Sequence, residues 1–476
     1  MEEIRVVSKN SLMIALREMI LRLTGLITFP LIARSIGVSV LGILGVAQAV
    51  SGILFLVADL GLNKSLVKEV AQNKSEEDSI FSNAFVLKAV SLAAAVGVGL
   101  ILVDLFTLDA FSKKLTIAVL FLGFFTGIQD LISSLFSAHE KMEFLPFVEG
   151  LSKASLLIGA VVIFLVLKGT IIHLQLYSIL VTVGIILLSL RLFVKKIKRI
   201  KFRVKPDLMP NLLRMSIPFM MVGFFSQTFG SIDSLMLASM LGRDAVGMYQ
   251  IAYRIITFLH FAPATVSAAL FPTLSRLYVE DYPKFELGLK RCFKYLLLLS
   301  ILSATTLNVL APFIIRTVFG QAYEGSIPLL QLLAWSMVFI FITFPLGVSL
   351  GVSGNQKDNV CAAVLGSAGN IVMNYAFIRL SGIDGVAIST VLTAVLVGAT
   401  SFYFFKRRFR RIEFFEPLPS ILLLATPLTA FLDINPVAKI VAFYSCFFSV
   451  VFLTKVLDKR DWRTFLRILR IESAFE

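Results

Sequence analysis

Ten ionisable side chains lie inside long apolar stretches of this sequence, where a charge is costly unless protein or water surrounds it. The basic members are Arg17, Arg22, Lys88, Lys153, Arg214 and Arg254, and the acidic members are Glu18, Asp130, Glu149 and Asp233. Because the basic groups outnumber the acidic ones, a water-filled space that they share would attract an anion. Arginine suits phosphate in particular, since its planar guanidinium binds two oxygens at once.

Helical spacing offers some of these charges a local partner. Glu18 and Arg22 lie four residues apart, as do Glu149 and Lys153, so each pair shares a helix face and could neutralise itself. Such pairs would join helices rather than bind a ligand. Arg17 and Arg254 are among the cations that have no acid at that spacing.

Depth in the apolar stretches separates the cations further. Three of them lie roughly ten residues inside, near the membrane midplane: Arg22, Lys153 and Arg254. We expect these three to face protein or water and not lipid. Arg214 lies only a few residues inside, so it can extend to the surface. Lys88 lies about one turn deeper, which leaves a surface role and a site role both open.

Asp233, in "SIDSLML", is a candidate for binding a coupling proton or Na⁺, with pairing to Arg254 or a packing role as the alternatives. The other carboxylates that could couple an ion are Glu18, Asp130 and Glu149. Asn370 and Asn374 are also four residues apart, and we expect their amides to hydrogen-bond across helices. The three histidines and three cysteines share no metal-ligand spacing, so we predict no metal site.

These residues lie in a chain of 476 residues that is 57% hydrophobic and 16% charged, with a mean hydropathy of +0.88. A soluble fold of this size could not bury so much apolar surface, so the composition predicts an all-α membrane protein. We predict about fourteen spans, at 11–36, 40–62, 82–104, 115–137, 145–167, 171–193, 210–240, 245–275, 289–311, 326–350, 359–379, 383–405, 416–432 and 436–456.

The net charge of +15 supports this map. With the N-terminus in the cytoplasm, about 31 Lys and Arg fall on the inner side, about 8 on the outer side and about 6 within spans. We therefore interpret the charge as a determinant of orientation and expect no nucleic-acid partner. Both termini are predicted to be cytoplasmic.

One motif occurs twice, 205 positions apart. Its first copy contains Ala33, Gly37, Gly42 and Ala47, and its second contains Ala238, Gly242, Gly247 and Ala252. Each copy falls at the first outer turn of one half of the chain. The spacing predicts two pseudosymmetric lobes of six helices with parallel orientation, an arrangement found in transporters. The predicted regions are 1–205, 206–411 and a remainder, 412–476, with two further helices.

Two stretches carry a family resemblance: "SIDSLMLASMLGRDAVGMYQIAYRIITFLHFAPATVSAALFPTLSRL" (231–277) and "GNIVMNYAFIRLSGIDGVAIST" (369–390). With "LITFPLIARSIGVSVLG" they resemble the polysaccharide-transporter branch of the multidrug/oligosaccharidyl-lipid/polysaccharide (MOP) exporter superfamily. The resemblance implies a flippase that moves a polyprenyl-linked oligosaccharide from the inner to the outer leaflet. The cations expected to meet the substrate phosphate are Arg17, Arg22, Lys88, Lys153 and Arg254.

The sequence thus predicts a non-enzymatic, multi-pass protein of the plasma or inner membrane that works by alternating access. We expect a monomer without cofactors other than a coupling proton or Na⁺. Its expected partners are membrane lipids and the polyprenyl-linked glycan, with other glycan-assembly proteins as candidates. Two alternatives remain: a multidrug antiporter of the same superfamily, and a membrane-embedded glycan polymerase or lipid-linked glycosyltransferase. The surplus of cations disfavours the first, and short loops without a D-x-D motif disfavour the second.

The topology is testable by labelling single cysteines in intact cells. Because "KRRFRR" (406–411) is predicted to be cytoplasmic and "LGRDAVG" (241–247) external, an impermeant reagent should label Arg243→Cys and not Arg408→Cys. Cell lysis should expose the second site, which controls for its reactivity. Labelling of Arg408→Cys but not Arg243→Cys in intact cells would overturn the map.

Overall fold

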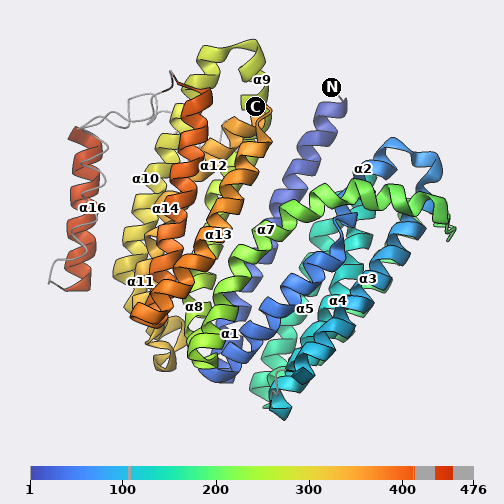
Figure 1. Ribbon diagram of the computed structural model, residues 1–476, viewed down its shortest axis with the longest axis horizontal. Coiled ribbons are helices and arrows are strands. Elements are labelled where there is room, and N and C mark those ends of the chain that lie inside the picture. Colours follow the sequence, from blue (N-terminus) through green and yellow to red (C-terminus); the bar gives the residue numbers. More distant parts are fainter. Residues whose placement is uncertain (1, 106–108, 411, 413–434, 454–476) are drawn as a thin grey trace. The chain divides into compact units, whose positions relative to one another are not determined.

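The structure, a computed structural model, describes residues 2–105, 109–410, 412 and 435–453. In these residues the regular elements are α-helices with short 3₁₀ and π segments, and no β-strand occurs (Figure 1). The predicted all-α class is confirmed. Hydrophobicity on all sides of most helices explains this architecture, since in lipid a helix satisfies its own backbone hydrogen bonds.

The helices follow the predicted spans closely. The first two spans lie in α1 (Glu2–Asp59), and the next four correspond to α3 (Glu77–Leu105), α4 (Ala110–Ala138), α5 (Phe144–Val161) and α6 (Ile171–Lys196). The later spans correspond to α7 (Met209–Leu241), α8 (Arg243–Leu259) with α9 (Phe261–Glu280), α10 (Tyr282–Ile314), α11 (Ser326–Ala334) with α12 (Ser336–Val352), α13 (Gln356–Ser381), α14 (Ile383–Arg408) and α16 (Pro436–Leu453). The predicted span 416–432 lies outside the described residues.

Ten segments of the described chain are long and apolar enough to cross a membrane, and two shorter apolar helices, Gly230–Leu241 and Ala438–Leu453, add to them. The first of the ten, Leu16–Gln72, contains two predicted spans, because the backbone is not helical at Gly37. It ends with α2 (Leu62–Gln72), a short helix that we did not predict.

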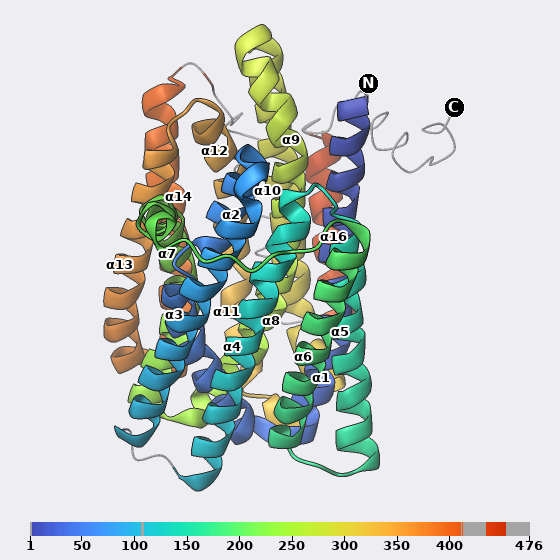
Figure 2. The ribbon, with the colours of Figure 1, turned by 90° about the vertical axis from the view of Figure 1, so that its right-hand side faces the viewer.

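The chain forms two compact units. The first comprises residues 1–258, 315–326 and 363–389, and the second comprises 259–314, 327–362 and 390–476. In the first unit α1 packs against α3, α4, α5 and α7, and α4 also packs against α6 (Figure 2). In the second unit α10 packs against α9, α12 and α16 around buried aromatic side chains such as Phe285, Phe405 and Phe443. The pseudosymmetry of the lobes 1–205 and 206–411 stays a prediction.

The two copies of the glycine motif form the same turn. Gly37 interrupts α1 with φ 76° and ψ 174°, and Gly242 separates α7 from α8 with φ 89° and ψ −178°. A positive φ of this kind strains any residue that carries a Cβ, so glycine is required at both positions. Each turn therefore ends one helix and starts the next at once.

The second glycine of each copy brings two helices into direct contact. A Cβ on Gly42 would lie 1.8 Å from the carbonyl oxygen of Arg243, and a Cβ on Gly247 would lie 2.2 Å from that of Val38. Val38 precedes Gly42 by the same four positions as Arg243 precedes Gly247. The copies therefore contact one another reciprocally, and we call this contact between α1 and α8 the glycine crossing.

Polar contacts join the same ends of these helices. Ser39 Oγ donates a hydrogen bond to Asp244 Oδ1, and these two residues are themselves 205 positions apart. Tyr323 Oη donates to the carbonyl oxygen of Ala33 at 2.7 Å, which ties the segment between α10 and α11 to α1. The glycine crossing is thus supported by hydrogen bonds as well as by backbone proximity.

We predict that Gly42→Ala destabilises the protein, because the added methyl group must separate two backbones that touch. Overpacking of this kind costs about 1–3 kcal/mol, which should lower the apparent melting temperature of the detergent-purified protein by several degrees. Gly184→Ala in α6 is the matched control, since no atom lies within 4 Å of the place that its added methyl group would take. An unchanged melting temperature for Gly42→Ala would contradict the geometry of the crossing.

Candidate functional site

An ion pair between α1 and α5 joins charges that helical spacing did not bring together. Arg17 Nε donates to Glu149 Oε2 at 2.7 Å, and Arg17 Nη1 lies 3.3 Å from Glu18 Oε1. The predicted pair of Glu18 and Arg22 is present, with Oε2 and Nε 3.6 Å apart. Arg17, which lacks an acid at helical spacing, is therefore shared between two carboxylates.

Lys153 is left without the partner that its spacing suggested. No ion pair joins it to Glu149, because that carboxylate is bound from α1 instead. Lys153 is exposed, and it lies roughly 140–160° around α5 from the exposed apolar residues Leu151 and Ile158. Its side chain is therefore not on the apolar face expected to meet lipid. The charged groups within electrostatic range of it are Glu149, Arg254 and Asp130.

Arg254 extends from the side of α8 toward α1. Its guanidinium carbon lies 4.8 Å from the centre of the Phe29 ring, and it is the one exposed residue among 245–259, all of which the structure describes. This is a cation–π contact, and the N–H donors of the guanidinium form no hydrogen bond with any residue that the structure describes. Gln48 is likewise the one exposed residue among 41–50 of α1. These two well-covered stretches thus each expose a single polar side chain.

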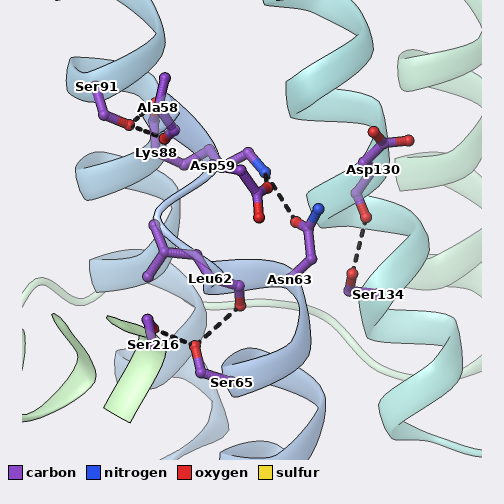
Figure 3. Close-up of polar contacts among 10 residues, drawn as sticks. All are labelled: Ala58, Asp59, Leu62, Asn63, Ser65, Lys88, Ser91, Asp130, Ser134 and Ser216. Carbon is purple, nitrogen blue, oxygen red and sulfur yellow. Dashed lines mark hydrogen bonds and ion pairs between the residues drawn. The ribbon is translucent and has the colours of Figure 1, made fainter. Parts of the chain in front are cut away.

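Lys88 is buried at the corner between α1 and α2 (Figure 3). Its side chain is 1% exposed, and its ammonium donates to Asp59 Oδ1 and, at 2.9 Å, to Asn63 Oδ1. The corner itself is formed by Leu60 and Gly61, which have φ values of 52° and 73°. Lys88 therefore fastens this turn to α3, and in this conformation its ammonium is committed to protein oxygens.

Asp130 lies near this corner but does not join it. Its main-chain oxygen accepts a hydrogen bond from Ser134 at 2.9 Å, while its exposed carboxylate forms no ion pair with any residue that the structure describes (Figure 3). The charges within electrostatic range of that carboxylate are Lys88, Glu149, Asp59 and Arg17. Arg214, near the start of α7, is exposed.

Asp233 is the centre of a second, buried polar cluster. Its carboxylate is 0% exposed and accepts hydrogen bonds from Tyr249 Oη at 2.5 Å and Asn374 Nδ2 at 2.6 Å. No ion pair joins Asp233 to Arg254, so that alternative from the sequence is wrong. The reason is that Asp233 turns toward α13 instead, where Asn374 bridges α7 and α13.

The cluster extends along α13 to α14. Asn374 Nδ2 also approaches Asn370 Oδ1 at 3.1 Å, and Ser389 Oγ donates to Asn374 Oδ1. Asn370 is 0% exposed, and its Nδ2 has no hydrogen-bond partner. The cluster therefore offers one carboxylate, two amides and hydroxyl groups in a buried place. Elsewhere in the described chain, no three His, Cys, Asp or Glu side chains gather as they would around a metal ion.

A family model described as "Polysaccharide biosynthesis protein" matches residues 7–278, which is more than half of the chain. The chain belongs to this family. A second model, MatE, matches residues 218–376. The resemblance to the MOP exporter superfamily is thereby confirmed, and this family member is a multi-pass membrane protein.

Solved structures share its fold. The lipid II flippase MurJ in an inward closed conformation has a TM-score of 0.73 at 18% identity, covering 92% of this chain and 98% of that one. An inward-facing multidrug resistance MATE transporter of the MOP superfamily has a TM-score of 0.69 at 16% identity, covering 83% and 96%. A MOP superfamily transporter from Pyrococcus furiosus, whose binding pocket is described as having reverse polarity, has a TM-score of 0.60 at 16% identity, covering 85% and 96%.

Curated relatives add little about function. An uncharacterized membrane protein of Methanocaldococcus jannaschii is 28% identical over 178 residues, covering 36% of this chain and 35% of that protein. Another from the same organism is 24% identical over 189 residues, covering 39% and 44%. The matches thus span less than half the length of these relatives.

The partners of the predicted charges were not visible in the sequence. Asp59 and Asn63 lie at the end of a span and resemble loop residues, and Tyr249 and Phe29 resemble ordinary apolar positions. In the sequence, the only indication of buried partners was that Lys88 and Asp233 are charged residues inside predicted spans.

We predict that the Lys88–Asp59 pair is structural. Lys88→Met leaves a carboxylate without its cation, which should cost on the order of 2 kcal/mol, less than for a fully buried pair because Asp59 is 26% exposed. The double variant Lys88→Met/Asp59→Asn should recover much of the lost thermal stability and should transport substrate. A stable double variant without transport would show instead that Lys88 contacts the substrate.

Proposed function

We propose that this protein flips a polyprenyl-(pyro)phosphate-linked oligosaccharide from the inner to the outer leaflet by alternating access. The observation that carries the proposal is the pair of midspan cations, Lys153 and Arg254, which form no ion pair with any described residue. One fold neighbour is a lipid II flippase, which supports a lipid-linked substrate for a member of this family.

The phosphate is the part of such a substrate that most needs the protein's help to cross the membrane. It carries the fixed negative charge, and moving that charge through hydrocarbon is costly without a compensating cation. Arg254 suits this role, because its guanidinium is held over the Phe29 ring while its N–H donors form no hydrogen bond with a described residue. Lys153 adds a second positive charge within electrostatic range.

The remaining cations have different roles. Glu18 and Glu149 form ion pairs with Arg17 and Arg22. These two arginines therefore contribute positive charge at fixed positions. An incoming phosphate could share them with those carboxylates. Lys88 is buried against Asp59 and serves the fold.

Alternating access requires one end of the path to close while the other opens. The glycine crossing is the candidate for the outer closure, because its two backbones touch and Ser39 bonds to Asp244 across it. Small residues at a helix crossing also allow separation without leaving large side chains to repack. We propose that this crossing opens when the substrate leaves.

We propose the Asp233 cluster as the site of a coupling proton or Na⁺. Its single carboxylate matches a single positive charge, and amide and hydroxyl oxygens from Asn370, Tyr249 and Ser389 lie around it. A divalent ion would ordinarily take more carboxylates than this cluster offers.

The alternatives have less support. A multidrug antiporter that exports cations needs acidic groups that face its cargo, whereas the intramembrane groups without an ion-pair partner among the described residues include two cations, Lys153 and Arg254, beside one acid, Asp130. A glycan polymerase or glycosyltransferase needs a site for chemistry, and the fold neighbours reported above are transporters.

The phosphate role of Arg254 is tested by flipping of a fluorescent, defined lipid-linked sugar in proteoliposomes. We predict that Arg254→Ala slows flipping by about tenfold or more, and that Arg254→Lys recovers little because an ammonium cannot form the bidentate contact. Arg214→Ala, which removes an exposed arginine of the same unit, should keep the parental rate. A well-folded Arg254→Ala protein that flips at the parental rate would remove the proposal.

Coupling is tested in the same proteoliposomes with an imposed Na⁺ or proton gradient. Asp233→Asn removes the negative charge but keeps the size of the side chain, so we expect flipping that no longer responds to either gradient. Asp104→Asn, at an exposed carboxylate, is the control. Parental gradient dependence in Asp233→Asn would exclude this site.

A further inference from the structure

The connection between α6 and α7 is an extended segment held rigidly against α3. Residues 198–205 contain no helical turn, and Figure 2 shows the chain running straight between the two helices. Arg203 N donates to Ser82 Oγ at 2.9 Å, and Lys205 exchanges two hydrogen bonds with the Asn83 amide, at 3.1 and 2.9 Å. Ser82 and Asn83 are both 0% exposed. Two buried side chains of α3 thus pair with this segment as a neighbouring β-strand would.

This pairing separates the side chains of the segment into two faces. The N–H groups of Arg203 and Lys205 point the same way, so side chains at odd and even positions lie on opposite sides. The even face carries Phe202 and Val204, which are 60% and 42% exposed. Phe202 packs edge-on against Phe85 with ring centres 6.1 Å apart. The odd face is basic.

The segment and the end of α6 carry seven basic residues: Lys195, Lys196, Lys198, Arg199, Lys201, Arg203 and Lys205. Lys198 binds Glu77 at 3.1 Å and Asp78 at 3.0 Å, and Lys205 binds Glu76 at 3.0 Å. Partial burial lowers the pKa of Lys198, but the hydrogen bonds that its ammonium donates to Asp78 and Glu77 outweigh this effect and leave the pKa above its ordinary value.

The other five basic residues are exposed and form no ion pair with any residue in the described ranges.

The position of the segment along α3 identifies what faces it. Ser82 and Asn83, which hold it, lie where the sequence predicts that the third span enters the membrane, about 9 Å from the start of α3 at Glu77. Exposed apolar side chains at this level are stabilised by the interfacial region of the bilayer, and lysine and arginine beside them reach lipid headgroups. None of the five cations is neutralised by an ion pair with an acidic residue in the described part of the chain.

We propose that residues 195–205 form a lipid-binding ledge that binds anionic phospholipid headgroups, with Phe202 and Val204 inserted beneath them. The rigid docking on Ser82 and Asn83 keeps the apolar face toward the acyl chains and presents the cations at the level of the phosphates. This proposal is independent of the transported substrate, because it rests on a surface outside the intramembrane charges.

Quenching by brominated lipids measures this contact directly in the full-length protein. Trp335 and Trp462 are changed to Phe, and Phe202→Trp supplies a single fluorophore on the ledge. The protein is reconstituted in phosphatidylcholine bilayers that contain increasing fractions of brominated phosphatidylglycerol, or of brominated phosphatidylcholine for comparison. The two quenching curves give the relative affinity of the ledge for the two headgroups.

We expect phosphatidylglycerol to be preferred by about tenfold or more, and the preference to weaken at high salt. Arg199→Gln/Lys201→Gln/Arg203→Gln should abolish it. The control Arg407→Gln/Arg408→Gln/Arg410→Gln removes equal charge from three exposed arginines elsewhere and should leave it intact. Both triple variants must elute as monodisperse protein. Equal quenching by the two lipids in the parent, or equal loss in both triple variants, would overturn the proposal. Absence of quenching would also overturn it and would indicate water or an acidic protein at the ledge.

Discussion

The contact of Gly42 with Arg243 and of Gly247 with Val38 is the constraint on which the site depends. No side chain separates the two backbones at this point, so the turns of the two motif copies are fixed against each other. The turns themselves need glycine with positive φ at Gly37 and Gly242. With α1 and α8 joined in this way, Gln48 and Arg254 become the exposed positions of two otherwise covered stretches.

The intramembrane charges divide by what holds them. Lys88, Arg17 and Arg22 contact carboxylates, which lowers the free-energy cost of their charges in the membrane. The contacts of Lys88 and Arg17 also fasten α1 to α3 and α5, whereas the contact of Arg22 lies within α1. Lys153 and Arg254 form no such pair with a described residue, so the free-energy cost of placing their charges in the membrane is offset only if another group supplies negative charge. In the function that we propose, the substrate phosphate supplies this negative charge during transport, which is why Lys153 and Arg254 are central to the proposal.

Much of the fold could be predicted from the sequence because lipid imposes simple rules. Spans follow from apolar length, and the distribution of Lys and Arg gives a consistent map. The glycine repeat predicted equivalent turns, but not that they touch each other. Helical spacing paired Glu18 with Arg22 correctly and Glu149 with Lys153 wrongly, since spacing within one helix cannot reveal that Arg17 approaches from another. For the same reason the bonds from Ser82 and Asn83 to a segment about 120 positions away were beyond prediction.

The central claim is that the glycine crossing opens during transport. Ser39 and Asp244 are hydrogen-bonded across it, so Ser39→Cys/Asp244→Cys should form a disulfide on oxidation. The decisive measurement is flipping of a lipid-linked sugar by this double variant before oxidation, after oxidation and after reduction, beside each single variant. The account predicts that oxidation stops flipping in the double variant only and that reductant restores it. A fully cross-linked protein that flips at the parental rate would contradict the account.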